Sequence, residues 1–181
     1  MRVIDINNKP DLRSVKTDKA LDDAIYELLR RRNFRKITVN DICMAAPVSR
    51  AAFYARYTDK YDLLENWLAR FCPQNNTGDD SYGSIETIIN EFVYENKAII
   101  KNIINEADQS TLDVLIQLII SFMNLSEKTG SMTAKTVQQS VYAGGIVNYI
   151  IWQVKNNFPD DVKPMNRYLY RVIVESGKID S

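Results

Sequence analysis

The segment from Ile37 to Leu64, ITVNDICMAAPVSRAAFYARYTDKYDLL, constrains the fold more than any other part of the chain. Its apolar residues follow helical spacing, but Pro47 interrupts them because proline cannot continue a helix. Thr38 and Ser49 are placed to cap a short helix on each side of that proline, and Asp59 to cap a third. Two short helices bury little surface. Their joint use is to present the second one outward, as a helix-turn-helix does to the DNA major groove.

The residue types on the second helix fit a DNA contact. Arg50 can donate two hydrogen bonds to guanine, while Ala51 and Ala52 are small enough to touch thymine methyl groups. Tyr54 and Lys60 suit phosphate oxygens. The helix beginnings at Thr38 and Ser49 offer further amide donors to phosphates, and Val48 and Phe53 are expected to point into the core.

Composition and periodicity predict an all-α protein with two domains. The chain is 45% hydrophobic and 25% charged, with few Gly and Pro residues, which is typical of a soluble helical protein. We expect a flexible arm at 1–16, a helix-turn-helix domain at 17–71, a linker at 72–84 and a helical domain at 85–181. The expected helices run from Thr17 to Arg32, from the caps Thr38, Ser49 and Asp59, and over 84–107 with a break near Asn96, 110–127, 133–157 and 161–176.

Charge and cysteine content limit the remaining functions. Residues 1–71 hold 14 Lys or Arg against 10 Asp or Glu, so the first part is electropositive although the whole chain is neutral. Two cysteines form no disulfide framework and no signal peptide is recognisable, so we expect a cytoplasmic protein. The chain has no histidine, and no residue group nominates an enzyme, a metal site or a cofactor.

A run of 19 uncharged residues, Thr136 to Val154, calls for a partner surface. Its polar residues leave too short an apolar stretch for a membrane span. Gly144 and Gly145 each cost roughly 1 kcal/mol against alanine within a helix, and a close crossing with another helix would offset that cost. The predicted dimer interface follows one helical stripe: Val141, Gly145, Asn148 and Trp152. Packing inside a single subunit is the alternative.

The quoted segment also resembles the DNA-binding domain of the TetR family of bacterial transcriptional regulators. The family pattern is Thr-hydrophobic-x-x-Ile-Ala-x-x-Ala-Gly-Val-Ser-x-x-x-Phe-Tyr-x-x-Phe-x-x-Lys-x-x-Leu. It is met here by Thr38, Val39, Ile42, Ala46, Val48, Ser49, Phe53, Tyr54, Lys60 and Leu63. The leader DLRSVKTDKAL and the distal YAGGIVNYIIWQVKNNFP loosely resemble a Gram-positive branch of that family.

The resemblance implies two sets of DNA contacts. Thr38, Ser49, Tyr54 and Lys60 would hold phosphates. Arg50, Ala51, Ala52, Arg56 and Asn40 would face bases. Cys43 stands where the family usually has alanine, and Arg56 where histidine is common. Pro47 stands where the family has a turn glycine, and since proline is locked near φ −65°, we expect this turn to differ locally.

The resemblance also implies a homodimer that binds a palindromic DNA operator and releases it when a small-molecule effector binds. The last two helices would pair with those of a second subunit. Helices between Ile85 and Leu125 would enclose the effector pocket. Its candidate lining residues are Phe92, Phe122, Met123 and Tyr149. The function expected is therefore a ligand-responsive repressor. The alternative is a helical interaction protein of the same fold that has lost DNA binding, favoured by Pro47 and the zero net charge.

Overall fold

The computed structural model describes residues 12–71, 92–124, 132–159 and 168, and side chains in most of these ranges. Residues 1–11 of the predicted arm, the predicted linker 72–84 and all of the predicted helix 161–176 except residue 168 lie outside the described residues. Every regular element in the described ranges is helical, as the sequence predicted. No described helix is long and apolar enough to cross a membrane.

The N-terminal part folds into four α-helices and a short 3₁₀ turn. They are α1 (Leu12–Leu29), η1 (Phe34–Lys36), α2 (Val39–Ala45), α3 (Arg50–Tyr54) and α4 (Lys60–Phe71). The first helix begins at Leu12, before the predicted cap Thr17, so residues 12–16 are helical and not part of an irregular arm. Its helical face reaches that far because Val15 and Lys16 carry no helix-breaking feature.

The core of this part is made by the inner faces of α1 and α4 around Phe53. Leu21, Ile25, Leu29 and Phe53 are completely buried, and α1 packs against α2 while α2 packs against α3. The predicted stripe of α1 therefore does face the core. Phe53 fixes α3 from below, so that the opposite side of this five-residue helix is left to solvent.

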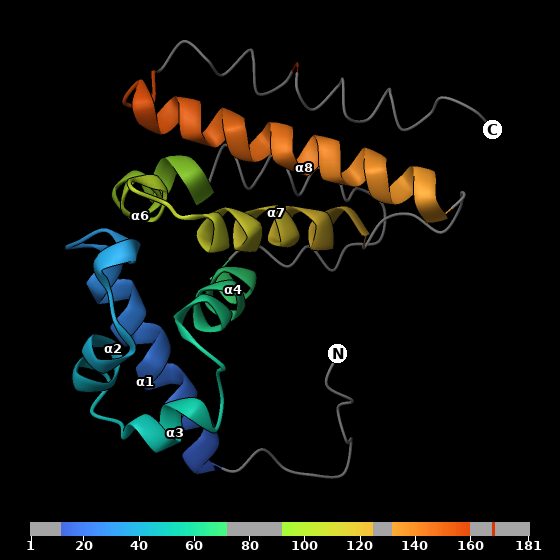
Figure 1. Cartoon of the computed structure of the whole chain (residues 1–181). Coiled ribbons are helices and arrows are strands. Elements are labelled where there is room, and N and C mark those ends of the chain that lie inside the picture. The colour runs from blue at the N-terminus through green and yellow to red at the C-terminus, as the bar shows by residue number, and fades with distance from the viewer. Residues whose placement is uncertain (1–11, 72–91, 125–131, 160–167, 169–181) are drawn as a thin grey trace.

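The C-terminal part contains α6 (Lys97–Ile104), α7 (Gln109–Asn124) and α8 (Met132–Lys155). The chain is helical from Phe92, turns at Asn96 and resumes as α6, so the predicted break near Asn96 is confirmed. Figure 1 shows α7 and α8 side by side, with α6 at one end and α4 beneath α7. The α3 end of α1 lies at the opposite end of the N-terminal part from this layer.

Candidate nucleic-acid interface

Capping interactions define both short helices. The Thr38 Oγ1 atom accepts a hydrogen bond from the Asp41 amide at 3.1 Å, and the Asp41 carboxylate accepts one from the Thr38 amide at 2.9 Å. This capping box satisfies two amides at the start of α2. The Ser49 Oγ atom accepts a hydrogen bond from the Ala52 amide at 3.1 Å and caps α3. Both predicted caps are confirmed, and they fix where the two helices begin.

The turn between these helices is where the structure differs from expectation. Pro47 has a φ of 28°, although the proline ring favours about −65°. The Val48 amide still donates to the Cys43 carbonyl at 3.1 Å, which is the long bond of a glycine-type helix ending. Pro47 therefore does not hold the expected φ near −65°, because the packed helices on either side keep the tight turn and proline takes the strain.

The outward side of α3 presents an arginine and a tyrosine together. Arg50, Ala51 and Tyr54 are exposed, and Ala52 is half-buried. The Arg50 guanidinium lies 5.8 Å from the centre of the Tyr54 ring and its Nη2 donates to the Tyr54 hydroxyl at 3.4 Å. The Tyr54 ring rests edge-on against Phe53 at 5.4 Å. Buried Phe53 therefore holds the pair in place at the protein surface.

Arg56, predicted to face bases, is engaged elsewhere. Its Nε atom donates to the Asp18 carboxylate of α1 at 2.7 Å, and its side chain is only 21% exposed. A second, longer hydrogen bond reaches the Ala52 carbonyl at 3.4 Å. The structure thus gives Arg56 a bracing position between α1 and the end of α3 and does not present it for a base contact.

Lys60, predicted to hold a phosphate, uses all of its hydrogen-bond donors within the protein. Its ammonium donates to the carbonyls of Phe34, Arg35 and Ile37 at 3.1, 3.1 and 3.0 Å. An ammonium has three donors, so none is left for DNA in this arrangement. Burial lowers the pKa of Lys60. The side chain fastens the start of α4 to the turn that precedes α2.

The remaining predicted contacts lie on the surface of α2 and at its start. Asn40 is exposed, and its Nδ2 atom makes a weak contact of 3.4 Å with the Met44 sulfur. Met44 is 74% exposed. The Thr38 hydroxyl donates to Asp41 at 2.7 Å, so its proton is already used in the cap. Cys43 is buried, and burial raises the pKa of its thiol, which keeps it unreactive.

A small apolar cavity lies between the two parts of the chain, with a volume of about 40 Å³. Of the candidate pocket residues, Phe92 lines this cavity and Tyr149 does not. That an effector binds there stays a prediction. The side chains of Phe122 and Met123 lie outside the described residues. The lining residues that sequence reasoning did not predict come from α4, α6, α7, α8 and the helical turn before α6: Leu68, Val93, Ile100, Ile103, Ile104, Leu115, Leu118, Ile119, Val147 and Ile150. The isoleucine pairs of α6 are the sequence signal that points to them.

The predicted dimer stripe forms one exposed face of α8. Val141 and Trp152 are 66% and 46% exposed, and Gly145 and Asn148 are exposed as well. The Trp152 ring stacks on Tyr149 with centroids 6.3 Å apart. A Cβ atom added at Gly145 would meet nothing within 4 Å. Large apolar side chains and an open glycine therefore share a surface that the described residues leave exposed.

Comparisons with known proteins agree with this geometry. Residues 22–66 match the family described as "Bacterial regulatory proteins, tetR family". A 65-residue segment is 34% identical to the uncharacterized HTH-type transcriptional regulator YxbF of Bacillus subtilis strain 168. That match covers 35% of this chain and only 17% of the relative, so this chain spans a small part of that protein's length.

Similar solved structures cover nearly the whole chain. The dihydroxyacetone kinase operon activator DhaS superposes with a TM-score of 0.59 at 16% identity, covering 91% of this chain and 98% of that protein. A TetR transcriptional regulator from Streptococcus agalactiae 2603V gives 0.60 at 18% identity, covering 89% and 95%. The repressor AlkX from Dietzia sp. strain DQ12-45-1b gives 0.53 at 16%, covering 87% and 95%. At these identities the likeness establishes the fold.

Proposed function

By its fold and its N-terminal domain this chain belongs to the TetR family of bacterial regulatory proteins, and from this premise we propose that it regulates transcription by binding a DNA operator. The proposal has three parts, which are sequence reading by α3, dimerisation through α8, and release by a small apolar molecule. The division into a DNA-binding domain over 17–71 and an effector and dimerisation domain over 85–181 belongs to the same proposal.

One observation carries the DNA-binding part. α3 is anchored by buried Phe53 and turns Arg50, Ala51 and Tyr54 outward. Arginine can bind the O6 and N7 atoms of guanine with two hydrogen bonds, and alanine can touch a thymine methyl group. Stacking against Tyr54 reduces the number of conformations that Arg50 must give up when it binds. Tyr54, Ser49 and the start of α2 at Thr38 would then contact the flanking phosphates.

A palindromic operator requires two copies of the recognition helix, and the exposed face of α8 supports a homodimer. Exposed Val141 and Trp152 flank Gly145, which permits close approach of a second helix. In a two-fold dimer the same stripe meets itself, so one apolar face suffices for the contact. The spacing of the two α3 helices would follow from this interface.

The apolar cavity supports regulation by a small apolar effector. The cavity is lined by Leu68 of α4 and by Ile103 and Ile104 of α6. A bound molecule would therefore contact both the N-terminal and the C-terminal part of the chain. Two residues after Ile104, Glu106 accepts hydrogen bonds from Lys36 at 3.1 Å and Asn33 at 3.2 Å. A ligand that fits the cavity better in one arrangement of these helices would shift the population towards it. We propose repression, with release on ligand binding.

The experiment is capture of genomic DNA fragments from the source bacterium by the purified protein. Fragments that share an inverted repeat, and that are lost with the Arg50→Ala protein, would support the proposal. Retention of no fragment above bulk DNA would contradict it. That second outcome would favour the alternative, an interaction protein of the same fold that has lost DNA binding. Loss of DNA binding would then explain the strained turn at Pro47 and the engagement of Arg56 and Lys60 by other parts of the protein.

A further inference from the structure

Half of the cations in residues 12–71 are already paired with carboxylates. Ion pairs join Arg32 to Asp41 at 3.1 Å, Lys36 to Glu106 at 3.1 Å and Arg56 to Asp18 at 2.7 Å, and further pairs join Arg30 and Arg31 to Glu27 and Arg70 to Asp22. A cation beside a carboxylate adds little to the field that a distant phosphate feels. The positive excess of the first part of the chain must therefore come from other residues.

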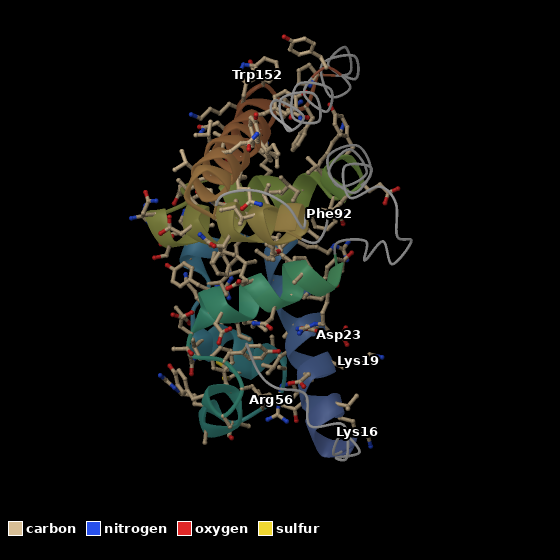
Figure 2. The ribbon with its side chains drawn as sticks, turned by 90° about the vertical axis from the view of Figure 1, so that its right-hand side faces the viewer. Lys16, Lys19, Asp23, Arg56, Phe92 and Trp152 are labelled. Atoms are coloured by element: carbon tan, nitrogen blue, oxygen red, sulfur yellow. The ribbon has the colours of Figure 1, made fainter. Side chains whose placement is uncertain are left out.

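Among the described side chains of residues 12–71, few cations lack both a carboxylate partner and the carbonyl acceptors that Lys60 has. Arg50 belongs to α3 and Arg35 to η1, while Lys16 and Lys19 stand in the first turns of α1. Both lysines are exposed. Figure 2 shows their side chains along one outer edge of α1, at the end of the molecule that carries Arg56.

The Arg56–Asp18 ion pair fixes these lysines relative to α3. Asp18 lies between Lys16 and Lys19 in the sequence, so both lysines stand within about 3 Å of it along the helix axis. Because Asp18 binds Arg56 at 2.7 Å, the turn of α1 that carries the lysines is tied to the residues that follow α3. The Asp18 carboxylate is neutralised by Arg56, which follows α3. The two lysines are exposed and have no carboxylate partner among the described residues.

We infer that Lys16 and Lys19 form a phosphate-binding edge of the DNA interface, beside the groove that α3 enters. This inference rests on the proposed function and adds residues that α2 and α3 do not supply. Lysine binds phosphate as a point charge on a flexible stem, so these contacts position the protein without reading bases. Arg56 is then a positioning residue, which holds the lysine edge against the recognition helix. The edge ends at Asp23, an exposed carboxylate one turn beyond Lys19 that phosphates would avoid.

The test is a salt series with a labelled duplex of random sequence, measured for the wild-type protein and for the double variant Lys16→Gln/Lys19→Gln. Each phosphate contact contributes about 0.9 to the slope of log affinity against log salt concentration, so the variant slope should be shallower by roughly two units for each bound chain, and roughly four for a dimer. Affinities for random and operator duplexes should fall by the same factor, because no base contact is removed. The double variant Lys16→Arg/Lys19→Arg should keep the wild-type slope.

The matched control is Lys101→Gln/Lys155→Gln, which removes two exposed cations from α6 and α8. Its slope should equal that of the wild type. A wild-type slope for Lys16→Gln/Lys19→Gln, or an equal loss in the control, would overturn the inference while leaving the proposed function intact. A wild-type protein that binds no duplex at any salt concentration would instead overturn the proposed function itself.

Discussion

At the scale of single residues, the strain of the helix-turn-helix is concentrated at Pro47. A φ of 28° is far from the range that the proline ring permits, and such a conformation costs on the order of 1–3 kcal/mol. Proline also has no amide hydrogen, so the second hydrogen bond of this type of helix ending, to the Met44 carbonyl, cannot form. The packing of α2 and α3 on the core must supply the energy that keeps this turn.

We therefore predict that Pro47→Gly stabilises the fold. Glycine adopts a positive φ without strain and restores the missing donor. The greater freedom of the unfolded chain offsets only about 0.4–1 kcal/mol of this gain. Urea unfolding should show a higher midpoint with an unchanged slope. Pro159→Gly is the control, since Pro159 has no positive φ, and it should lower the midpoint. Equal losses in both variants would show that the Pro47 turn stores no strain.

Arg50→Ala is expected to lose about 1–3 kcal/mol of binding free energy for the operator, and to relax base choice at one position of each half-site. Its charge is exposed and stacked on Tyr54, so its removal leaves the fold intact. Competition between operator variants in a binding titration measures both effects. Arg31→Ala, which removes a cation already paired with Glu27, is the control. An unchanged base preference would remove Arg50 from the reading set.

Local sequence was enough to predict the caps at Thr38 and Ser49 and the inward anchor Phe53, because a cap oxygen and the amide that donates to it lie three residues apart. It was not enough for Arg56 and Lys60. Asp18 lies 38 residues before Arg56, and the carbonyls that bind Lys60 lie 23 to 26 residues before it. Residues so far apart in the sequence are brought together by how the helices pack, and the spacing of residues within one helix cannot predict such pairs.

At the scale of elements, the loop between α6 and α7 joins the two parts of the chain. Asp108 accepts a hydrogen bond from the Tyr61 hydroxyl of α4 at 2.6 Å, and Asn102 donates to the Leu29 carbonyl of α1 at 2.7 Å. Glu106, at φ 59°, accepts from Lys36 and Asn33. The sequence predicted the helices on both sides of this loop but not these contacts, since each needs a residue from the N-terminal part.

The Tyr61–Asp108 contact predicts a defined pH dependence of stability. Burial raises the pKa of Asp108, but hydrogen bonds from Tyr61 and Thr111 outweigh it and bring the pKa to about 2, below the usual 3.8. The contribution of Asp108 to stability is therefore complete above about pH 4 and is lost as the pH falls towards 2. The same hydrogen bond raises the pKa of Tyr61 to about 12 from the usual 10, so its contribution is lost as the pH rises through that interval.

Tyr61→Phe should accordingly be less stable than the wild type at neutral pH, with the difference shrinking below pH 4 and above pH 10. Urea unfolding at a series of pH values measures it. Tyr54→Phe is the control, because the Tyr54 side chain lies on the exposed face of α3, and its stability curve should follow that of the wild type. A difference between Tyr61→Phe and wild type that is constant from pH 2 to 12 would rule out this linkage.

At the scale of the whole molecule, the account requires a dimer. The stripe of Val141, Gly145, Asn148 and Trp152 was predicted from a run of uncharged residues that is too polar for a membrane, and the four residues do share one exposed face of α8. Whether a second copy covers this face is a question of association, which the fold of one chain does not decide. All of the predicted helix over 161–176 except residue 168 lies outside the described residues.

Gly145→Leu tests the assembly. Within one chain a side chain at this position meets nothing within 4 Å, and replacing a helical glycine removes roughly 1 kcal/mol of unfavourable helix propensity. The single chain should thus fold at least as well, while a tight crossing with a second α8 is blocked. Sedimentation velocity at micromolar concentration should show a wild-type dimer and a variant monomer. Gln117→Leu, on the exposed side of α7, should remain dimeric. A variant that stays dimeric would move the interface elsewhere.

The most direct test of the central claim is a binding titration on two duplexes of equal length, one carrying the inverted repeat recovered from genomic DNA and one with its bases scrambled. The account predicts tighter binding to the inverted repeat, with two chains per duplex, and affinities for both duplexes that fall steeply as salt is raised. Equal affinity for the two duplexes would contradict sequence reading by α3, and an affinity that does not change with salt would contradict DNA binding as the function of this fold.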